Sequence, residues 1–454
     1  MPRSMSRVQI PSPAPIFKRP YGTFFYFPLL TKESLLIISV PMKDKTLQIL
    51  NTSVFLQTQI FLLPVLFLFY QSCGLGVGDY FLFQGVFAFS ALLFEVPAGV
   101  LADAISKRSV LILSYSLFIA RLVLWLFFAR WGYWILLTGE ILYAAQKATF
   151  SGIADSYIFE YLKLKKIPGQ MNSRYGKMNF FMSIGTAFSS LVGAYIYKSV
   201  SDWSLVKYGT DYGFVVLISM ELILNLSALA LLFFLPKIPA TYKQKKSLKQ
   251  IYSDLFRTVK WTMTNKKSRM TYHIIYSGLL VAMTSVFVWS FQPIMKLLLV
   301  PVSLFGVVYF VNHLLRALSS LCLGKIMRIL SIKDLAVFSF IMFAGCFALT
   351  FVFLNVTALP VYISLLYFIF ISVAIGVALA FSLSSISRIH GLISVNMRAT
   401  ISSISSGTGR LCSAFFFVLL KILMDGVSMQ NSFAVCALIF LLGLYPLKKI
   451  CDCK

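Results

Sequence analysis

The chain has 454 residues, of which 59% are hydrophobic and only 12% are charged, and its formal net charge is +26. A water-soluble protein of this length could not cover so much apolar surface with a polar shell. Apolar stretches recur along the chain, and each is long enough for a helix of about 20 residues to cross ~30 Å of hydrocarbon. The composition therefore excludes a soluble fold and predicts an all-α membrane protein, because spanning helices satisfy their own backbone polar groups.

The positive charge does not indicate a nucleic-acid partner, because Lys and Arg gather in short stretches between apolar ones, where they orient membrane spans. We find no Gly-rich phosphate loop, no His/Cys cluster with metal-ligand spacing and no nucleophile–base pair. We therefore expect no enzyme, no catalytic residue, no cofactor and no metal. Five of the 7 Cys lie in or beside apolar stretches as small hydrophobes. Cys451 and Cys453 have neither redox nor zinc spacing, so we expect no disulfides.

The beginning of the chain differs from the rest. It is rich in proline, carries scattered Lys and Arg with Glu33 as the acid, and its apolar run 35–40 is too short to span. We interpret residues 1–46 as an N-terminal extension that is disordered or comes from an upstream start. In that hypothesis Met42 begins the functional chain, and a native N-terminus near Pro2 would contradict it.

Twelve apolar spans follow. We place them at 49–72, 79–102, 109–129, 131–155, 175–198, 212–235, 272–296, 302–325, 333–354, 360–386, 399–424 and 431–448. Residues 47–235 and 272–448 would then form two pseudo-symmetric six-helix bundles, joined by residues 236–271 and followed by a tail, 449–454. Lys and Arg gather in the turns on one side, which predicts that both termini are cytoplasmic.

The segment between the two bundles has its own pattern. Leu248, Ile251, Leu255 and Val259 recur at helical spacing with basic residues between them. This predicts an amphipathic basic helix on the inner leaflet of the membrane. The alternative is a helix packed on the cytoplasmic ends of the spans, and the two interpretations are compatible.

The turn after the second span carries the most specific motif. Gly99 is followed four residues later by Asp103 and then by the basic pair Lys107 and Arg108, after which a new apolar stretch begins. The pattern resembles the loop between helices 2 and 3 of the major facilitator superfamily. Residues 151–156 and 396–403 add to the resemblance, so the chain is similar to a bacterial-type permease over residues 47–448.

The resemblance implies a gate on the cytoplasmic side. Asp103 would lie at the N-terminus of span eleven near Arg398, where the helix dipole stabilises an anion. Lys107 and Arg108 would reach Asp155 or Glu160. The alternative is that Lys107 and Arg108 only set topology. The chain also departs from the family pattern. Ala104 and Ser106 replace the usual residues, the second-half copy has Arg328 where an Asp would stand, and helix 5 lacks the Gly-Pro of antiporters.

Charged residues deep in a span are costly and indicate function. At ~1.5 Å per residue, Arg121 lies roughly 18 Å above the cytoplasmic end of span three, and Glu140 roughly 13 Å below the outer end of span four. The two meet at one depth, as does Glu221. We expect the substrate-binding or proton-coupling residues to be Arg121, Glu140, Lys147, Glu221, His313, Arg316, Arg410 and Gln57. The alternatives are that Arg121 and Glu140 form a structural ion pair, and that Glu221 only pairs with Arg121.

Span five carries Gly185, Ser189 and Gly193 at every fourth position. Small residues at this spacing let another helix approach closely, so the pattern predicts helix packing rather than substrate contact.

The resemblance and the charges together predict a secondary active transporter that moves a small solute by alternating access. We expect coupling to protons carried by Glu140 or Glu221, a lipid environment, a monomer and a place in the inner (plasma) membrane. An uncoupled facilitator and an efflux pump for amphipathic compounds are alternatives. A receptor or scaffold that transports nothing is the alternative from another class.

Overall fold

The computed structural model describes residues 44–165, 171–238, 253, 270–356, 359–393 and 395–452. The contacts within the chain divide it into two units, Met1–Val40 and Pro41–Lys454, and all described residues belong to the second unit. The proposed N-terminal extension, apart from its last three residues, lies outside the described residues, as does the proposed amphipathic helix except for Ser253. The backbones of Asp103 and Arg398 are described as helical, but their side chains are not.

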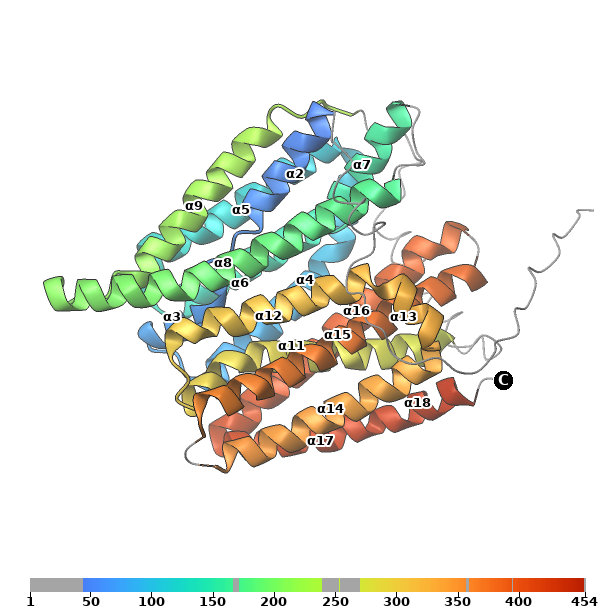
Figure 1. Cartoon of the computed structure of the whole chain (residues 1–454). Coiled ribbons are helices and arrows are strands. Elements are labelled where there is room, and N and C mark those ends of the chain that lie inside the picture. The colour runs from blue at the N-terminus through green and yellow to red at the C-terminus, as the bar shows by residue number, and fades with distance from the viewer. Residues whose placement is uncertain are drawn as a thin grey trace, which may run out of the picture. The chain divides into compact units, whose positions relative to one another are not determined.

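All regular elements of the described residues are helices (Figure 1). The first half, residues 44–238, contains α2 (Lys45–Gln57), η1 (Leu63–Val65), α3 (Leu66–Ser72), α4 (Val77–Ala104), α5 (Lys107–Phe128), η2 (Ala129–Trp131), α6 (Tyr133–Phe150), α7 (Ile153–Leu164), α8 (Met171–Tyr208) and α9 (Gly213–Leu232). The second half, residues 270–452, contains α11 (Met270–Leu297), α12 (Val302–Leu321), α13 (Leu323–Ile329), α14 (Ile332–Leu354), α15 (Val361–Leu392), α16 (Val395–Gly426), α17 (Met429–Phe440), η4 (Leu441–Gly443) and α18 (Leu444–Cys451).

Ten helical segments of the described residues are long and apolar enough to cross a membrane, and Leu63–Ser72 is a shorter apolar helix. Large apolar side chains such as Phe127, Trp134 and Leu226 remain exposed on the sides of these helices. Lipid suits such surfaces, because a soluble monomer rarely exposes extended apolar patches. The helices therefore define an integral, multi-pass membrane protein.

Among the predicted spans that differ from the observed helices, three in the first half change its course. The first is interrupted, because α2 ends at Gln57 and η1 begins at Leu63. The fourth ends at Phe150, since Gly152 adopts a left-handed φ of 74° and redirects the chain into α7. The fifth is longer than expected, because α8 continues unbroken from Met171 to Tyr208.

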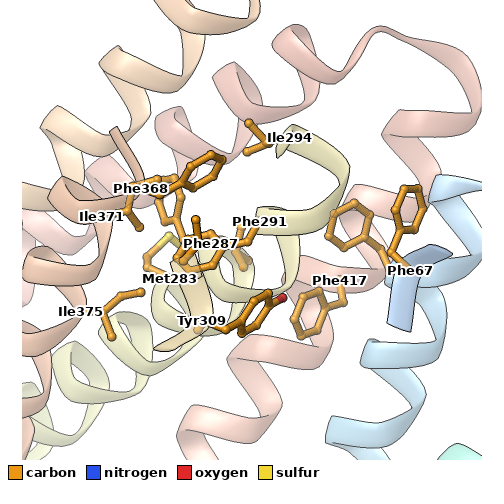
Figure 2. Packing of buried hydrophobic residues seen from close by; sticks show 14 of the residues in the cluster. Phe67, Met283, Phe287, Phe291, Ile294, Tyr309, Phe368, Ile371, Ile375 and Phe417 are labelled. Atoms are coloured by element: carbon orange, nitrogen blue, oxygen red, sulfur yellow. The ribbon is translucent and has the colours of Figure 1, made fainter. Parts of the chain in front are cut away.

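Helices from the two halves pack along each other, α4 against α16 and α8 against α12. Aromatic and branched side chains of α11, α12 and α15 pack together in one part of the core, and Phe67 of α3 and Phe417 of α16 extend it (Figure 2). Phe291 of α11 contacts both Tyr309 of α12 and Phe368 of α15, with ring centroids 5.7 and 5.4 Å apart. Contacts of this kind hold the spans in fixed positions around the polar residues described next.

Basic residues mark one end of the bundle, which we call the basic end. There Asp44, at the start of α2, accepts a hydrogen bond from the Tyr161 hydroxyl of α7, and Arg108 donates to the Phe233 carbonyl after α9. At the opposite end, which we call the far end, Lys421 of α16 lies 3.2 Å from Asp79 of α4. The chain thus runs from end to end with each successive span.

Candidate functional site

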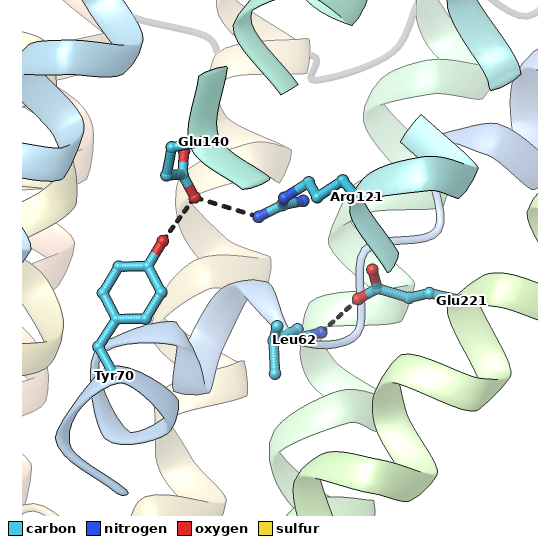
Figure 3. Close-up of polar contacts among 5 residues, drawn as sticks. All are labelled: Leu62, Tyr70, Arg121, Glu140 and Glu221. Carbon is cyan, nitrogen blue, oxygen red and sulfur yellow. Dashed lines mark hydrogen bonds and ion pairs between the residues drawn. The ribbon is translucent and has the colours of Figure 1, made fainter. Parts of the chain in front are cut away.

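Arg121 of α5 and Glu140 of α6 form a buried ion pair (Figure 3). The Nη2 atom of Arg121 lies 3.3 Å from Oε1 of Glu140, and the two residues are 3% and 1% exposed. The Tyr70 hydroxyl of α3 donates to the same oxygen at 2.5 Å. The carboxylate therefore has both a counter-ion and a hydrogen bond, the conditions under which a buried charge is tolerated.

Aromatic rings enclose the guanidinium of Arg121. Its Cζ lies 3.9 Å from the ring centroid of Trp125 and 4.4 Å from that of Tyr143. The negative face of an aromatic ring attracts a cation, most strongly where water is excluded. Arg121 is thus held by one carboxylate and two rings, which fixes the guanidinium midway along α5.

Glu221 of α9 lies beside the interruption of the first span. It is 0% exposed, and its Oε1 accepts a hydrogen bond of 2.7 Å from the Leu62 amide, just before η1 begins (Figure 3). Its Oε2 has no hydrogen-bond partner among the described residues. A carboxylate at the start of a helix satisfies a free amide and complements the helix dipole. The alternative in which Glu221 pairs with Arg121 is not seen among the described ion pairs, in which Arg121 pairs with Glu140.

Further backbone groups at and just after the interruption also have side-chain partners. Ser189 of α8 accepts from the Ile60 amide at 3.0 Å. Gln292 of α11 accepts from the Phe67 amide at 2.7 Å and donates to the Leu63 carbonyl at 2.9 Å. Irregular backbone at membrane depth is tolerated only where protein or water satisfies it. Helices α8, α9 and α11 therefore stabilise the interrupted span jointly.

The small residues of span five accommodate the same interruption. A Cβ on Gly193 would lie 2.1 Å from the Phe61 carbonyl oxygen, and one on Gly185 would lie 2.5 Å from Gln59 Nε2. The predicted close packing is confirmed, although the partner is the non-helical stretch of the first span rather than a regular helix.

Arg410 of α16 pairs with Glu95 of α4, across the two halves. Its Nη1 lies 3.5 Å from Glu95 Oε2 and donates to the Ala91 carbonyl at 2.7 Å. The Ser406 hydroxyl donates to the other oxygen of Glu95 at 3.0 Å. Sequence reasoning placed Arg410 at mid-depth but did not assign Glu95, which lay within the motif before Gly99.

His313 and Arg316 lie on α12, one turn apart. Nε2 of His313 is buried without a hydrogen-bond partner among the described residues. Arg316 lies deep among protein atoms, while part of its surface remains accessible. The structure does not join this pair to Arg121 and Glu140 through any described hydrogen bond or ion pair.

Two further predicted residues lie in the first half. Lys147 of α6 is partly buried, with its Nζ 5.1 Å from the ring centroid of Tyr143. Gln57, the last residue of α2, is 1% exposed, and its Nε2 has no partner among the described residues. Both therefore lie near the groups that surround Arg121 and the interruption.

The predicted gating residues occupy the basic end. Lys107 lies 3.9 Å from Glu160, one of its two expected partners, whereas Arg108 donates to the Phe233 carbonyl and forms no ion pair with a carboxylate among the described side chains. Gly99 lies on an open face of α4 with no heavy atom within 4 Å of an added Cβ. Burial raises the pKa of Asp155, on α7, from 3.8 to about 6.

Sequence reasoning missed Tyr70, Glu95 and Gln292, all of which bind residues or backbone of the polar interior. Glu95 could have been found from its depth, since it lies nine residues before the end of α4. Tyr70 and Gln292 carried no such signal, because neutral polar residues are common in spans.

Charged pairs and an unpaired carboxyl oxygen inside a helical membrane bundle are the layout of a solute transporter. The sequence model of the Major Facilitator Superfamily matches residues 49–416, and the chain belongs to this family. No curated protein matches the sequence.

Several solved transporter structures share the fold. The nucleoside transporter NupG has a TM-score of 0.71 at 14% identity, covering 90% of this chain and all of its own. A D-xylose–proton symporter has a TM-score of 0.64 at 14% identity, covering 91% and 97%. The human organic anion transporter MFSD10 has a TM-score of 0.59 at 15% identity, covering 90% and 100%. Identities this low establish the fold alone.

Proposed function

We propose that this protein is a secondary active transporter that moves a small solute across the membrane by alternating access. The family and the transporter structures that share its fold support this role. In the proposal α6 and the interrupted pair α2–α3 join the ten apolar helices as spans, giving twelve. Residues 47–235 and 272–448 form the two moving bundles, and residues 236–271 connect them.

The proton carrier in this proposal is Glu221. Its Oε2 is buried without a partner among the described residues, whereas Glu140 is held by Arg121 and Tyr70. An ionised Glu221 would leave a buried oxygen charged and unpaired, while a protonated one is neutral and still accepts from Leu62. Proton binding and release at Glu221 therefore change the charge beside Arg121 and the interrupted span. This unpartnered oxygen is the observation that carries proton coupling.

We place both termini in the cytoplasm, in the plasma (inner) membrane of the cell, because the basic end would face inward by the positive-inside rule. Asp103 and Arg398, with Gly99, Lys107, Arg108 and Asp155, remain our candidates for the inner gate. The contacts of Lys421 with Asp79 and of Lys296 with Gln71, 3.2 and 2.6 Å, join the two halves at the far end. A bundle closed at one end and rocking about its interior is the motion that alternating access requires.

The test uses the full chain in proteoliposomes with a solute panel and an imposed pH gradient. We expect gradient-driven accumulation in wild type, its loss in Glu221→Gln, and persistent solute exchange in that variant because its carboxyl is permanently neutral. Asp202→Asn, at an exposed position on α8, is the matched control and should keep full accumulation. Full accumulation in Glu221→Gln would contradict the carrier assignment. Wild-type flux indifferent to the gradient would favour an uncoupled facilitator.

A further inference from the structure

Arg316 has no counter-ion among the described residues. The carboxylates inside the spans are engaged elsewhere, because Glu140 pairs with Arg121, Glu95 pairs with Arg410 and Glu221 accepts from a backbone amide. A guanidinium stays charged at any ordinary pH. An unpaired charge within a span is costly and is retained where a ligand or water compensates it.

The position of Arg316 on α12 directs it toward the interior. Tyr309 lies two turns earlier on the same face, and its hydroxyl accepts a hydrogen bond of 2.9 Å from Gln292 of α11. His313 lies between them on this stripe, with its Nε2 free of any described partner. The flank of α12 next to this stripe packs on α15, where Asn312 donates to Ser372 at 3.3 Å and Ser319 would meet an added Cβ of Gly376 at 2.6 Å. The other flank packs on α8, where Phe310 contacts the ring of Phe188. The stripe of Tyr309, His313 and Arg316 therefore lies between the flank that packs on α15 and the flank that packs on α8.

The pair formed by Arg410 and Glu95 shows how an anion is bound between the helices of this bundle. The Glu95 carboxylate pairs with the Arg410 guanidinium and also accepts a hydrogen bond from the Ser406 hydroxyl. One anion is thus bound by one charged donor and one neutral donor. Arg316 with His313 offers the same combination, one guanidinium and one neutral polar atom, but contains no carboxylate of its own. Guanidinium groups bind carboxylate and phosphate oxygens through two parallel hydrogen bonds.

We propose that Arg316 and His313 bind the acidic group of a small organic anion, which supplies the counter-ion that Arg316 lacks among the described residues. The inference rests on the proposed transport function, since it names the substrate class. Arg316 holds two oxygens of a carboxylate or phosphate monoester, and His313 contributes one neutral contact. Arg410 remains with Glu95, so the site selects a single acidic group.

The experiment measures ligand-induced stabilisation of the purified full chain by thermal unfolding in detergent. The probes are acetate, lactate, benzoate and glycerol phosphate, each compared with its neutral counterpart, acetamide, lactamide, benzamide and glycerol. A ligand that binds only the folded state raises the melting temperature with its concentration. We expect at least one anion to stabilise the wild type while its neutral counterpart does not, and the effective anions distinguish carboxylate from phosphate.

Arg316→Gln should weaken the apparent affinity for that anion on the order of tenfold or more, as expected for a lost charged hydrogen bond. Arg328→Gln removes the same charge from an exposed position on α13 and should leave the shift intact. Arg316→Lys keeps the charge without the two-pronged geometry and should retain weakened binding, which keeps the test valid if the Gln variant does not fold. Equal shifts by anions and neutral counterparts, or full anion binding in both Arg316 variants, would overturn the proposal.

The flux assay separates this inference from the proposed function. Gradient-driven transport of neutral solutes that is unaffected by anions would support the transport function and contradict the anion site. Anion binding that depends on Arg316, without flux of any solute, would support the site and contradict transport.

Discussion

Removing one member of the Arg121–Glu140 pair should destabilise the protein far more than removing both. At an effective dielectric constant of about 20, unit charges 3.3 Å apart attract each other by roughly 5 kcal/mol. Either Arg121→Gln or Glu140→Gln leaves the other charge buried, at a cost of about 3–5 kcal/mol. The double variant contains no buried charge at this position. We expect its loss of stability to be smaller than that of either single variant, and therefore well below the sum of the two single losses.

Thermal unfolding of all four proteins in one detergent measures this coupling. Size-exclusion profiles before heating show which variants are folded, and lipid addition rescues marginal ones. Additive losses would refute the argument, because residues in contact must couple if the ion pair is present. Transport in the double variant separates the two interpretations of the pair. Restored stability with restored flux indicates a structural pair, and restored stability without flux indicates that the charges serve transport.

Three further changes test other parts of the structure by thermal unfolding. Gly193→Ala would place Cβ 2.1 Å from the Phe61 carbonyl oxygen, so overpacking should cost about 1–3 kcal/mol. Gly99→Ala, with no heavy atom within 4 Å, is its control, and equal effects would contradict the packing. Because burial raises the pKa of Asp155 to about 6, its ionisation costs stability increasingly from about pH 4 to pH 6. The melting temperature of Asp155→Asn should therefore exceed that of wild type at pH 7.5, and the difference should become smaller toward pH 4. A difference that does not change with pH would contradict this reasoning. Gln292→Leu should lower the free energy of unfolding by about 1–3 kcal/mol, because it leaves backbone groups of the interrupted span without a hydrogen-bond partner. An unchanged melting curve would contradict the role of Gln292 as their partner.

Depth along a span could be predicted from the sequence, because the rise of a helix is fixed. Counting residues brought Arg121 and Glu140 to one level, and the structure joins them at 3.3 Å. Counting also placed Arg410 at mid-depth. The direction of a side chain around the helix and the identity of its partner depend on which helices are neighbours, which the hydropathy of single spans does not encode. Glu95 was therefore overlooked as the partner of Arg410, although both lie on helices that pack across the two halves.

The interruption of the first span shows most clearly why the rest could not be predicted. Residues 49–72 are apolar enough overall to predict one span, and Pro64 is a local signal of a break, because proline removes a helical amide and clashes with the preceding turn. Pro64 does not by itself place the end of the helix at Gln57, seven residues earlier. The helix can end there because α8, α9 and α11 supply partners for backbone groups that an unbroken helix would satisfy itself. Those partners, Ser189, Glu221 and Gln292, lie 129, 159 and 225 residues from the amides that they bind. Glu221 thus has a structural role through one oxygen, which accepts from the Leu62 amide, and its second oxygen is available to bind a proton. Because the same side chain meets both needs, a change of charge at Glu221 acts directly on the segment that contacts both halves of the protein.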